Sequence, residues 1–337
     1  TLILEGAGGI FTLGTQNNAV TTLDANNSVL GTLIFRDDTG FAVAGITAGA
    51  NNVTLSSAGG TVTQSAVISC ATLILEGAGG IFTLGTQNNA VTTLDADNTA
   101  LGTLSFRDDN GGFIVAGINC AGNNVTLSST AAVTQTGVIT AAGLELLGAG
   151  GTYTLNTQNN AVITIAGSTG TVLFRDDTGF AVGTVNTAGL TTTGNTTFTT
   201  TGTVTQTAAV GAATLFLTGA GTYTLGTQNN AVTTLDADNN LLGGNLSFRD
   251  DNGGFIVAGI NCAGNNVTLS STAAVTQTGV ITAAGLELLG AGGTYTLNTQ
   301  NNAVITIAGS TGTVLFRDDT GFAVGTVNTA GLTTTGN

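Results

Sequence analysis

The chain has 337 residues but contains no proline, methionine, tryptophan, histidine or lysine. Without histidine, a Ser-His-Asp triad and histidine-based acid–base catalysis are excluded. Proline would remove a hydrogen bond from a β-ladder, so its absence is compatible with uninterrupted strand pairing. The sequence also lacks a run of 18 apolar residues, and we therefore expect no transmembrane helix and no membrane insertion of this segment.

Positive charge is equally scarce, because five arginines stand against 19 acidic residues and the formal net charge is −14. A nucleic-acid partner needs a basic face, so that class of function is excluded. An anionic lipid surface is disfavoured for the same reason. We expect most of the acids to keep the chain soluble.

Three cysteines give little support for a disulfide framework. Cys120 and Cys262 occupy equivalent positions in repeated segments, Cys70 has no equivalent, and no CxxC pair occurs. We expect all three to be small buried apolar residues, with an interchain disulfide as the alternative.

What the chain does contain is one 71-residue unit written almost five times. The tract from Leu104 to Asn195 returns letter for letter from Leu246 to Asn337. A fixed period of this kind predicts a stacked array rather than a globule. We expect a single elongated domain over residues 1–337 that is an excerpt of a longer chain. The copies are residues 1–71, 72–142, 143–213, 214–284 and the partial 285–337.

Comparison of the copies predicts which side chains are buried. The second and fourth positions of every copy are leucine, whereas the third position varies and accepts glutamate. Alternate residues of a strand face opposite sides, so we expect the leucines inside and the variable position in solvent. The variable residues are Ile3, Ile74, Glu145, Phe216 and Glu287.

Later strands show the same pattern, with a constant phenylalanine flanked by variable residues. We expect these short strands to be separated by turns, where glycine supplies the unusual backbone angles and the Asn-Asn pairs tolerate left-handed geometry. Together these features predict an all-β fold, a parallel β-helix (β-solenoid) with about three coils of about 24 residues in each unit. Four coils of about 18 residues are the alternative. The constant phenylalanines are Phe35, Phe106, Phe174, Phe248 and Phe316.

The one recurrent charged motif is Phe-Arg-Asp-Asp, which holds every arginine of the chain. We expect the aspartates to cap a turn and the arginine to offset their repulsion. A catalytic carboxylate pair, as in glycoside hydrolysis, is the alternative. However, neighbouring residues on a strand point in opposite directions, and five equal copies of the motif argue against one catalytic centre. We therefore expect no catalytic residues.

A second acidic pattern carries oxygen ligands of the kind that calcium prefers. Asp95 and Asp97 recur as Asp236 and Asp238, whereas the third copy lacks the segment. The calcium-binding nonapeptide repeat is absent. These four aspartates are weak calcium candidates, and we otherwise expect no metal and no cofactor.

Three stretches resemble the repeats of large secreted bacterial exoproteins, the filamentous-haemagglutinin-like, β-strand-repeat adhesins. They are residues 143–162, residues 169–195 and the Thr-Val-Thr-Gln-Thr-Ala segment at 203–208. The resemblance extends over essentially the whole chain and lies in the general pattern of residues within the repeats. It implies a right-handed parallel β-helix, an extracellular location on the bacterial cell surface and an adhesive, fibre or matrix role. It brings no residue-level binding site with it.

The sequence thus favours a structural function, the shaft of an adhesin or fibre. Self-association into a filament or matrix is the main alternative, with a host-cell, glycan or matrix ligand as the expected partner. Two further alternatives are a polysaccharide-acting β-helix enzyme and an ice-binding module. The latter is suggested by the threonine-rich stretch at residues 191–201, but threonine spacing is not uniform across the copies.

Overall fold

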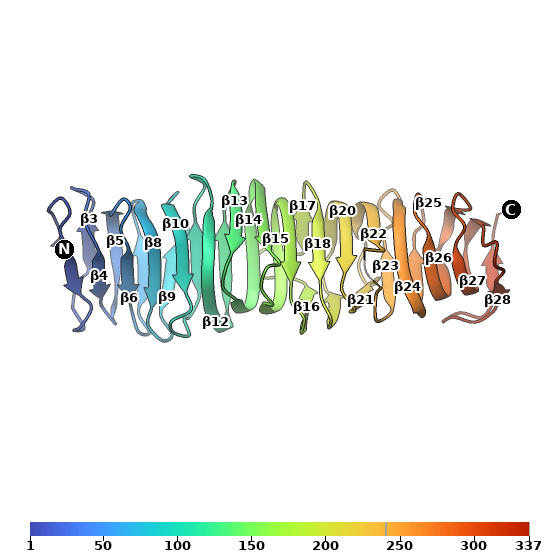
Figure 1. The fold of residues 1–337 in the computed structure, drawn as a ribbon, viewed down its shortest axis with the longest axis horizontal. Helices are drawn as coiled ribbons and strands as arrows, with labels where there is room; N and C mark the ends of the chain where they lie inside the picture. Colours follow the sequence, from blue (N-terminus) through green and yellow to red (C-terminus); the bar gives the residue numbers. More distant parts are fainter. Residues whose placement is uncertain (240, 337) are drawn as a thin grey trace. The chain divides into compact units, whose positions relative to one another are not determined.

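The computed structural model describes residues 1–239 and 241–336; Asn337, which ends the fifth copy, lies outside them. The described residues form β-strands, turns and bends, without an α-helix among them. The chain divides into two compact units, residues 1–170 and 171–337. Within each unit the strands follow one another along the stack in the order of the sequence (Figure 1), and many of them pair with the strand two places later.

The first unit contains fourteen strands and the beginning of β15. They are β1 (Leu2–Ile3), β2 (Phe11–Leu13), β3 (Thr22–Ala25), β4 (Leu33–Arg36), β5 (Gly40–Thr47), β6 (Val53–Ser56), β7 (Thr61–Gln64), β8 (Ile68–Glu76), β9 (Ile81–Leu84), β10 (Ala90–Ala96), β11 (Leu104–Arg107), β12 (Phe113–Ser128), β13 (Ala132–Gln135), β14 (Ile139–Leu155) and β15 (Ala161–Arg175).

The second unit contains the end of β15 and the remaining strands. They are β16 (Gly179–Val182), β17 (Leu190–Thr192), β18 (Thr196–Thr199), β19 (Thr203–Gln206), β20 (Val210–Thr218), β21 (Thr222–Leu225), β22 (Ala231–Ala237), β23 (Leu246–Arg249), β24 (Phe255–Ser270), β25 (Ala274–Gln277), β26 (Ile281–Leu297), β27 (Ala303–Phe316), β28 (Ala323–Val324) and β29 (Leu332–Thr334). Several strands are longer than the short pieces that the sequence predicts, because pairing continues through bends and bulges.

Strand pairing is parallel throughout the ladders described, which confirms the β-solenoid. Leu33 pairs with Val53, and Val53 pairs with Leu73, so the chain returns to the same place after 20 residues. Other steps along the ladders are mostly close to this length. The coil is therefore shorter than 24 residues, and a 71-residue unit contains about three and a half coils.

The half coil makes successive copies change sides. Two columns of paired strands can be defined in each unit, called column A and column B. In the first unit, the second copy starts in column B, where Leu73 pairs with Val53 and Leu94. The third copy starts in column A, where Leu144 pairs with Val125. In the second unit, Leu215 pairs with Leu235 in column B and Leu286 pairs with Val267 in column A.

The core is made of the side chains that the sequence predicted to be inside. Leu73, Leu144, Leu215 and Leu286 are fully buried, as are the constant phenylalanines of the first four copies. Phenylalanines from adjacent strands meet edge to face; the rings of Phe248 and Phe255 lie 5.0 Å apart. Such contacts add stability beyond the apolar area that they bury.

Glycine permits the sharp turns between the columns. Gly254 has a φ of +78°, and a Cβ there would collide with the backbone of Ala274 on the neighbouring coil. The sequence predicted that the Asn-Asn pairs would share this left-handed geometry. That prediction was wrong: among the described residues, positive φ occurs only at glycine.

Candidate functional site

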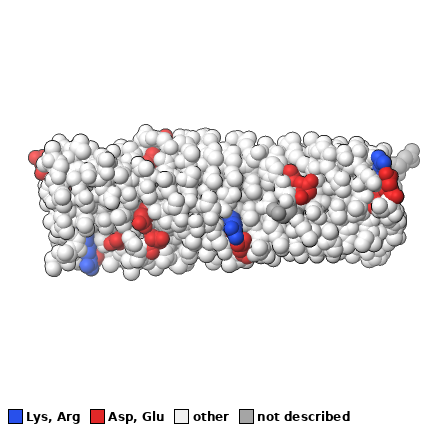
Figure 2. Space-filling model, in the orientation of Figure 1, with Lys and Arg blue, Asp and Glu red and all other residues white. Residues whose placement is uncertain are grey.

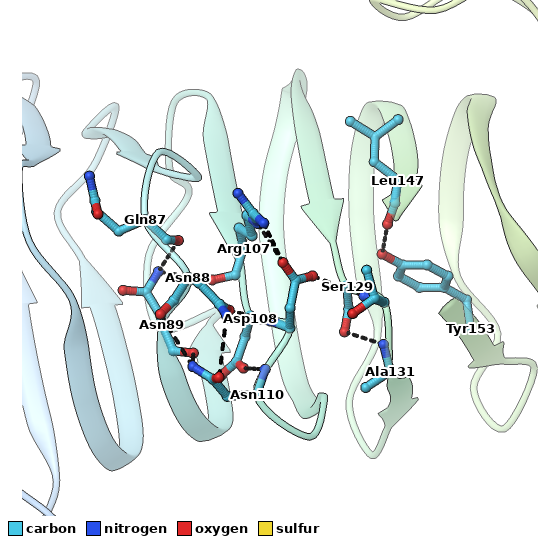
Figure 3. Close-up of polar contacts among 12 residues, drawn as sticks. Gln87, Asn88, Asn89, Arg107, Asp108, Asn110, Ser129, Ala131, Leu147 and Tyr153 are labelled. Carbon is cyan, nitrogen blue, oxygen red and sulfur yellow. Dashed lines mark hydrogen bonds and ion pairs between the residues drawn. The ribbon is translucent and has the colours of Figure 1, made fainter. Parts of the chain in front are cut away.

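The Phe-Arg-Asp-Asp motif places its two carboxylates on different partners. The first aspartate is buried: Asp108 accepts hydrogen bonds from the backbone N–H of Val91 (2.6 Å) and of Asn110 (2.8 Å). Burial raises the pKa of Asp108, and the two backbone N–H groups oppose that shift. This carboxylate closes its own turn and holds the preceding coil, as Figure 3 shows for Asn110.

The second aspartate faces outward and pairs with the arginine. Arg107 donates to Asp109 through Nε at 2.7 Å, and its terminal nitrogen lies 2.5 Å from the same carboxylate. Asp109 also accepts the backbone N–H of Thr130 on the next coil. Because neighbouring carboxylates diverge in this way, they do not form the converging pair that glycoside hydrolysis requires. The cap and the charge pairing predicted from the sequence are present, and the ion pairs are Arg36–Asp38, Arg107–Asp109, Arg175–Asp177, Arg249–Asp251 and Arg317–Asp319.

A buried asparagine forms a clamp across three successive coils. The Asn89 Oδ1 accepts from Gln64 Nε2 and from the backbone N–H of Ile68, both at 2.9 Å. Its Nδ2 donates to the carbonyls of Leu84 (3.0 Å) and Arg107 (2.9 Å). Asn89 is completely shielded from solvent, and Figure 3 shows its amide beside Arg107 and Asp108. The sequence placed the Asn-Asn pairs in turns and missed this role.

The same clamp recurs in the second unit at two equivalent asparagines. Asn230 bonds to Gln206, Val210, Leu225 and Arg249, and Asn302 bonds in the same way to its own neighbours. One signal in the sequence could have revealed it: the Thr-Gln before the second to fifth copies and the Gln-Asn-Asn within each copy never vary.

The predicted calcium ligands come together only in pairs. Asp236 Oδ1 lies 3.5 Å from the backbone nitrogen of Asp238 and accepts from Asn239 Nδ2 at 3.3 Å. Burial raises the pKa of Asp236, as it does that of Asp95, where the Asp97 charge adds to the effect. Across residues 1–239 and 241–336, no group of three or more acidic, cysteine or histidine side chains could hold a metal ion. Calcium at Asp95/Asp97 and Asp236/Asp238 remains a prediction that would need carbonyl or water ligands as well.

The glutamates at the variable third position correct a prediction. The sequence placed Glu145 and Glu287 in solvent, but each is only 1% exposed. Residues 325–331, called the strap, cover Glu287: Asn328 Nδ2 donates to its Oε2 (2.6 Å) and the Thr329 N–H donates to its Oε1 (2.8 Å). The side chain points away from the core, as alternation requires, and a loop from more than 40 residues later shields it.

The strap closes on itself as well as on Glu287. Thr326 and Ala330 form an antiparallel bridge, and Gly331 N–H donates to the Gly325 carbonyl. The Thr268 hydroxyl on the preceding coil also bonds to Glu287 (3.1 Å). Burial by itself would raise the pKa of Glu287, but the hydrogen bonds from Asn328 and Thr329 hold it below its usual value.

A first prediction follows for the Glu287→Gln variant. A lowered pKa in the folded state means that the charged carboxylate stabilises the strap at neutral pH, and that this stabilisation is lost as pH falls through the folded pKa. Removing the charge should weaken the strap by about 1 kcal/mol, the difference between charged and neutral hydrogen bonds. Amide hydrogen exchange of residues 325–331 measures the effect, and faster exchange is expected in the variant at neutral pH and in the native protein in acid.

The control for this variant is Glu76→Gln. Glu76 accepts one hydrogen bond at the surface, from Asn98 Nδ2, so exchange in the strap should be unaffected. Equal strap protection in native and Glu287→Gln proteins would show that other contacts hold the loop.

A groove lined by both apolar and hydroxyl-bearing residues lies on the outer face of column A in the second unit. It has a volume of about 570 Å³ and its charged lining consists of Arg249 and Asp251, which neutralise each other. The rest of its polar lining is hydroxyl-bearing: Thr227, Ser247, Thr268, Ser270 and Thr272. On the face seen in Figure 2, charged side chains form separated groups among uncharged residues.

The three cysteines are free and buried, as the sequence predicted. Burial raises the pKa of each thiol to about 12, that of Cys70 with a further contribution from Asp108. Because the thiolate is the reactive form, an interchain disulfide would require a coil to open first.

Comparison with protein-family models, with curated proteins and with solved structures found no match. In the described part of the chain there is also no helix with the length and apolar character to span a membrane.

Proposed function

We propose that this chain is part of the shaft of a secreted bacterial adhesin or surface fibre, located outside the cell. The observation that carries the proposal is that each 71-residue copy continues the coil of the copy before it. Inter-coil ladders and the Asn clamps repeat with the copies, so extra copies extend the stack without a new kind of contact. Copy number then sets length, which is what a spacer requires.

Two properties support an extracellular shaft. The texture of the repeats resembles that of filamentous-haemagglutinin-like adhesins. The chain also has no lysine and only five arginines, so trypsin-like proteases have few cleavage sites.

An in-frame deletion tests the proposal. Leu104 and Leu246 begin identical tracts, so removal of residues 104–245 rejoins equivalent positions and removes about seven coils. At about 4.8 Å for each coil, the particle should shorten by about 34 Å in electron micrographs and keep its width. A shorter particle of unchanged width supports the shaft. An unchanged length, or a compact particle, would contradict it, and indefinite filaments of the native chain would instead favour self-assembly.

A further inference from the structure

The groove of column A has a feature that sets two copies apart from the others. Its floor carries Ser247 where the first and third copies carry Ile34 and Leu173. The second copy has Ser105 at the same position. A hydroxyl at this point gives the floor of the groove a hydrogen-bonding group, whereas a branched apolar side chain would fill the groove without one.

Ser247 belongs to a row of hydroxyls that follows the stacking direction. Thr224 pairs with Ser247, and Ser247 with Thr268, so these three coils each contribute one hydroxyl on the outer side of the column before the row reaches Glu287. The first unit has the matching row of Thr83, Ser105 and Thr126. The row advances by about 4.8 Å for each coil, a step close to the length of one sugar in an extended β-linked chain.

The hydroxyls beside this row are available to a ligand. Within the described residues, the hydroxyls of Ser247 and Ser270 have no hydrogen-bond partner in the protein. Thr268, by contrast, donates to Glu287 and accepts from Asn328 Nδ2, so its hydroxyl is already engaged. The groove therefore offers both donors and acceptors, in a volume typical of small-molecule sites.

Charge decides which polymer fits. Arg249 is bound to Asp251, so the groove offers no free cation to a sulfate or carboxylate. The chain as a whole carries a formal charge of −14, which repels polyanions. Neither the Arg249–Asp251 ion pair nor the net negative charge of the chain weakens the binding of an uncharged ligand.

We propose that the Ser247 groove, and its counterpart at Ser105, bind an extended, uncharged β-linked glycan that lies along the stacking direction. This proposal rests on the adhesive role proposed above and names the class of ligand. Hydroxyl groups of successive sugars exchange hydrogen bonds with Ser247 and Ser270, which line the groove on successive coils, while Arg249 donates from the side of the groove.

The test uses the full chain and a double variant, Ser105→Leu with Ser247→Leu. The chain itself carries leucine at this position in the third copy, so the fold accepts it. Both serines are replaced because one intact groove would mask the loss of the other. The matched control is Thr134→Val with Thr276→Val, which changes outward residues of column B away from the groove.

Binding is measured by calorimetry with a soluble β-1,4-linked glucan oligosaccharide and by cosedimentation with cellulose, with heparin as the anionic comparison. The native chain and the column B control are expected to bind the neutral glucans, and the double leucine variant to bind at least about tenfold more weakly, the effect of losing roughly one hydrogen bond to a polar ligand. Unchanged binding by the leucine variant, preferential binding of heparin, or no binding of either glucan by the native chain would overturn the proposal. Because the deletion experiment measures length alone, the shaft proposal stands or fails separately.

Discussion

Truncation of Phe248 to alanine is expected to lower the free energy of unfolding by about 4 kcal/mol, the usual cost of removing a buried aromatic ring. Phe248 is fully buried in column A and meets Phe255 edge to face. The coil cannot collapse around the missing ring because backbone ladders on both sides fix its position, with Leu225 paired below and Leu269 paired above. Urea denaturation followed by far-UV circular dichroism measures the loss.

Two further variants test whether the loss of stability comes from the volume and the burial of the ring. Phe248→Leu retains most of the volume and should lose less than half as much stability. Phe316→Ala removes the equivalent ring in the fifth copy, where the side chain is only half-buried, and should also cost less. Equal losses at Phe248 and Phe316 would show that burial within the stack does not decide the cost.

Replacement of Asn230 by alanine is expected to cost about 3 kcal/mol, although the residue lies outside any regular strand. The change leaves the Leu225 carbonyl and the N–H of Val210 without their partner and frees the Gln206 amide. The Arg249 carbonyl loses the side-chain donor and keeps only the backbone N–H of residue 230. Buried groups that lose a hydrogen bond pay their full desolvation cost. Because the clamp joins three coils, hydrogen exchange should accelerate on the coils of Gln206 and Arg249 together.

Asn18→Ala is the natural control for the clamp. Asn18 donates to the carbonyls of Leu13 and Arg36 as its equivalents do, but its Oδ1 accepts no glutamine amide in the described structure, and the side chain is partly exposed. A loss of about 1 kcal/mol is expected there. Similar losses at Asn18 and Asn230 would show that the glutamine contributes nothing.

The buried faces of the strands were predictable from the sequence because they depend on local alternation. Leucine and phenylalanine stay constant where neighbours vary, and a period of two is enough to assign sides. The coil length was harder to predict, because the sequence period of 71 residues is not a whole number of coils. The strand pairing shows that a copy begins half a coil away from its predecessor, since Leu73 pairs in column B and Leu144 in column A.

The polar contacts were missed where the partners are distant in the sequence. Asn89 looks like a turn residue, and its partners Gln64 and Arg107 are 25 and 18 residues away. Glu287 looks exposed because its strap lies 41 and 42 residues later, at Asn328 and Thr329. A clue was nevertheless present, since glutamate occurs at this position only in the two copies that also carry the Val-Asn-Thr loop.

Because each repeat contains an extra half coil, the effect of adding or removing copies depends on whether their number is odd or even. Within a unit, gain or loss of a single copy would move the copy that follows to the other column, whereas a change by two copies would leave it in the same column. The exact duplication in this chain has the second form, since Leu104 and Leu246 begin identical tracts two copies apart. Recombination that keeps a binding groove on its original side must therefore exchange copies in even numbers.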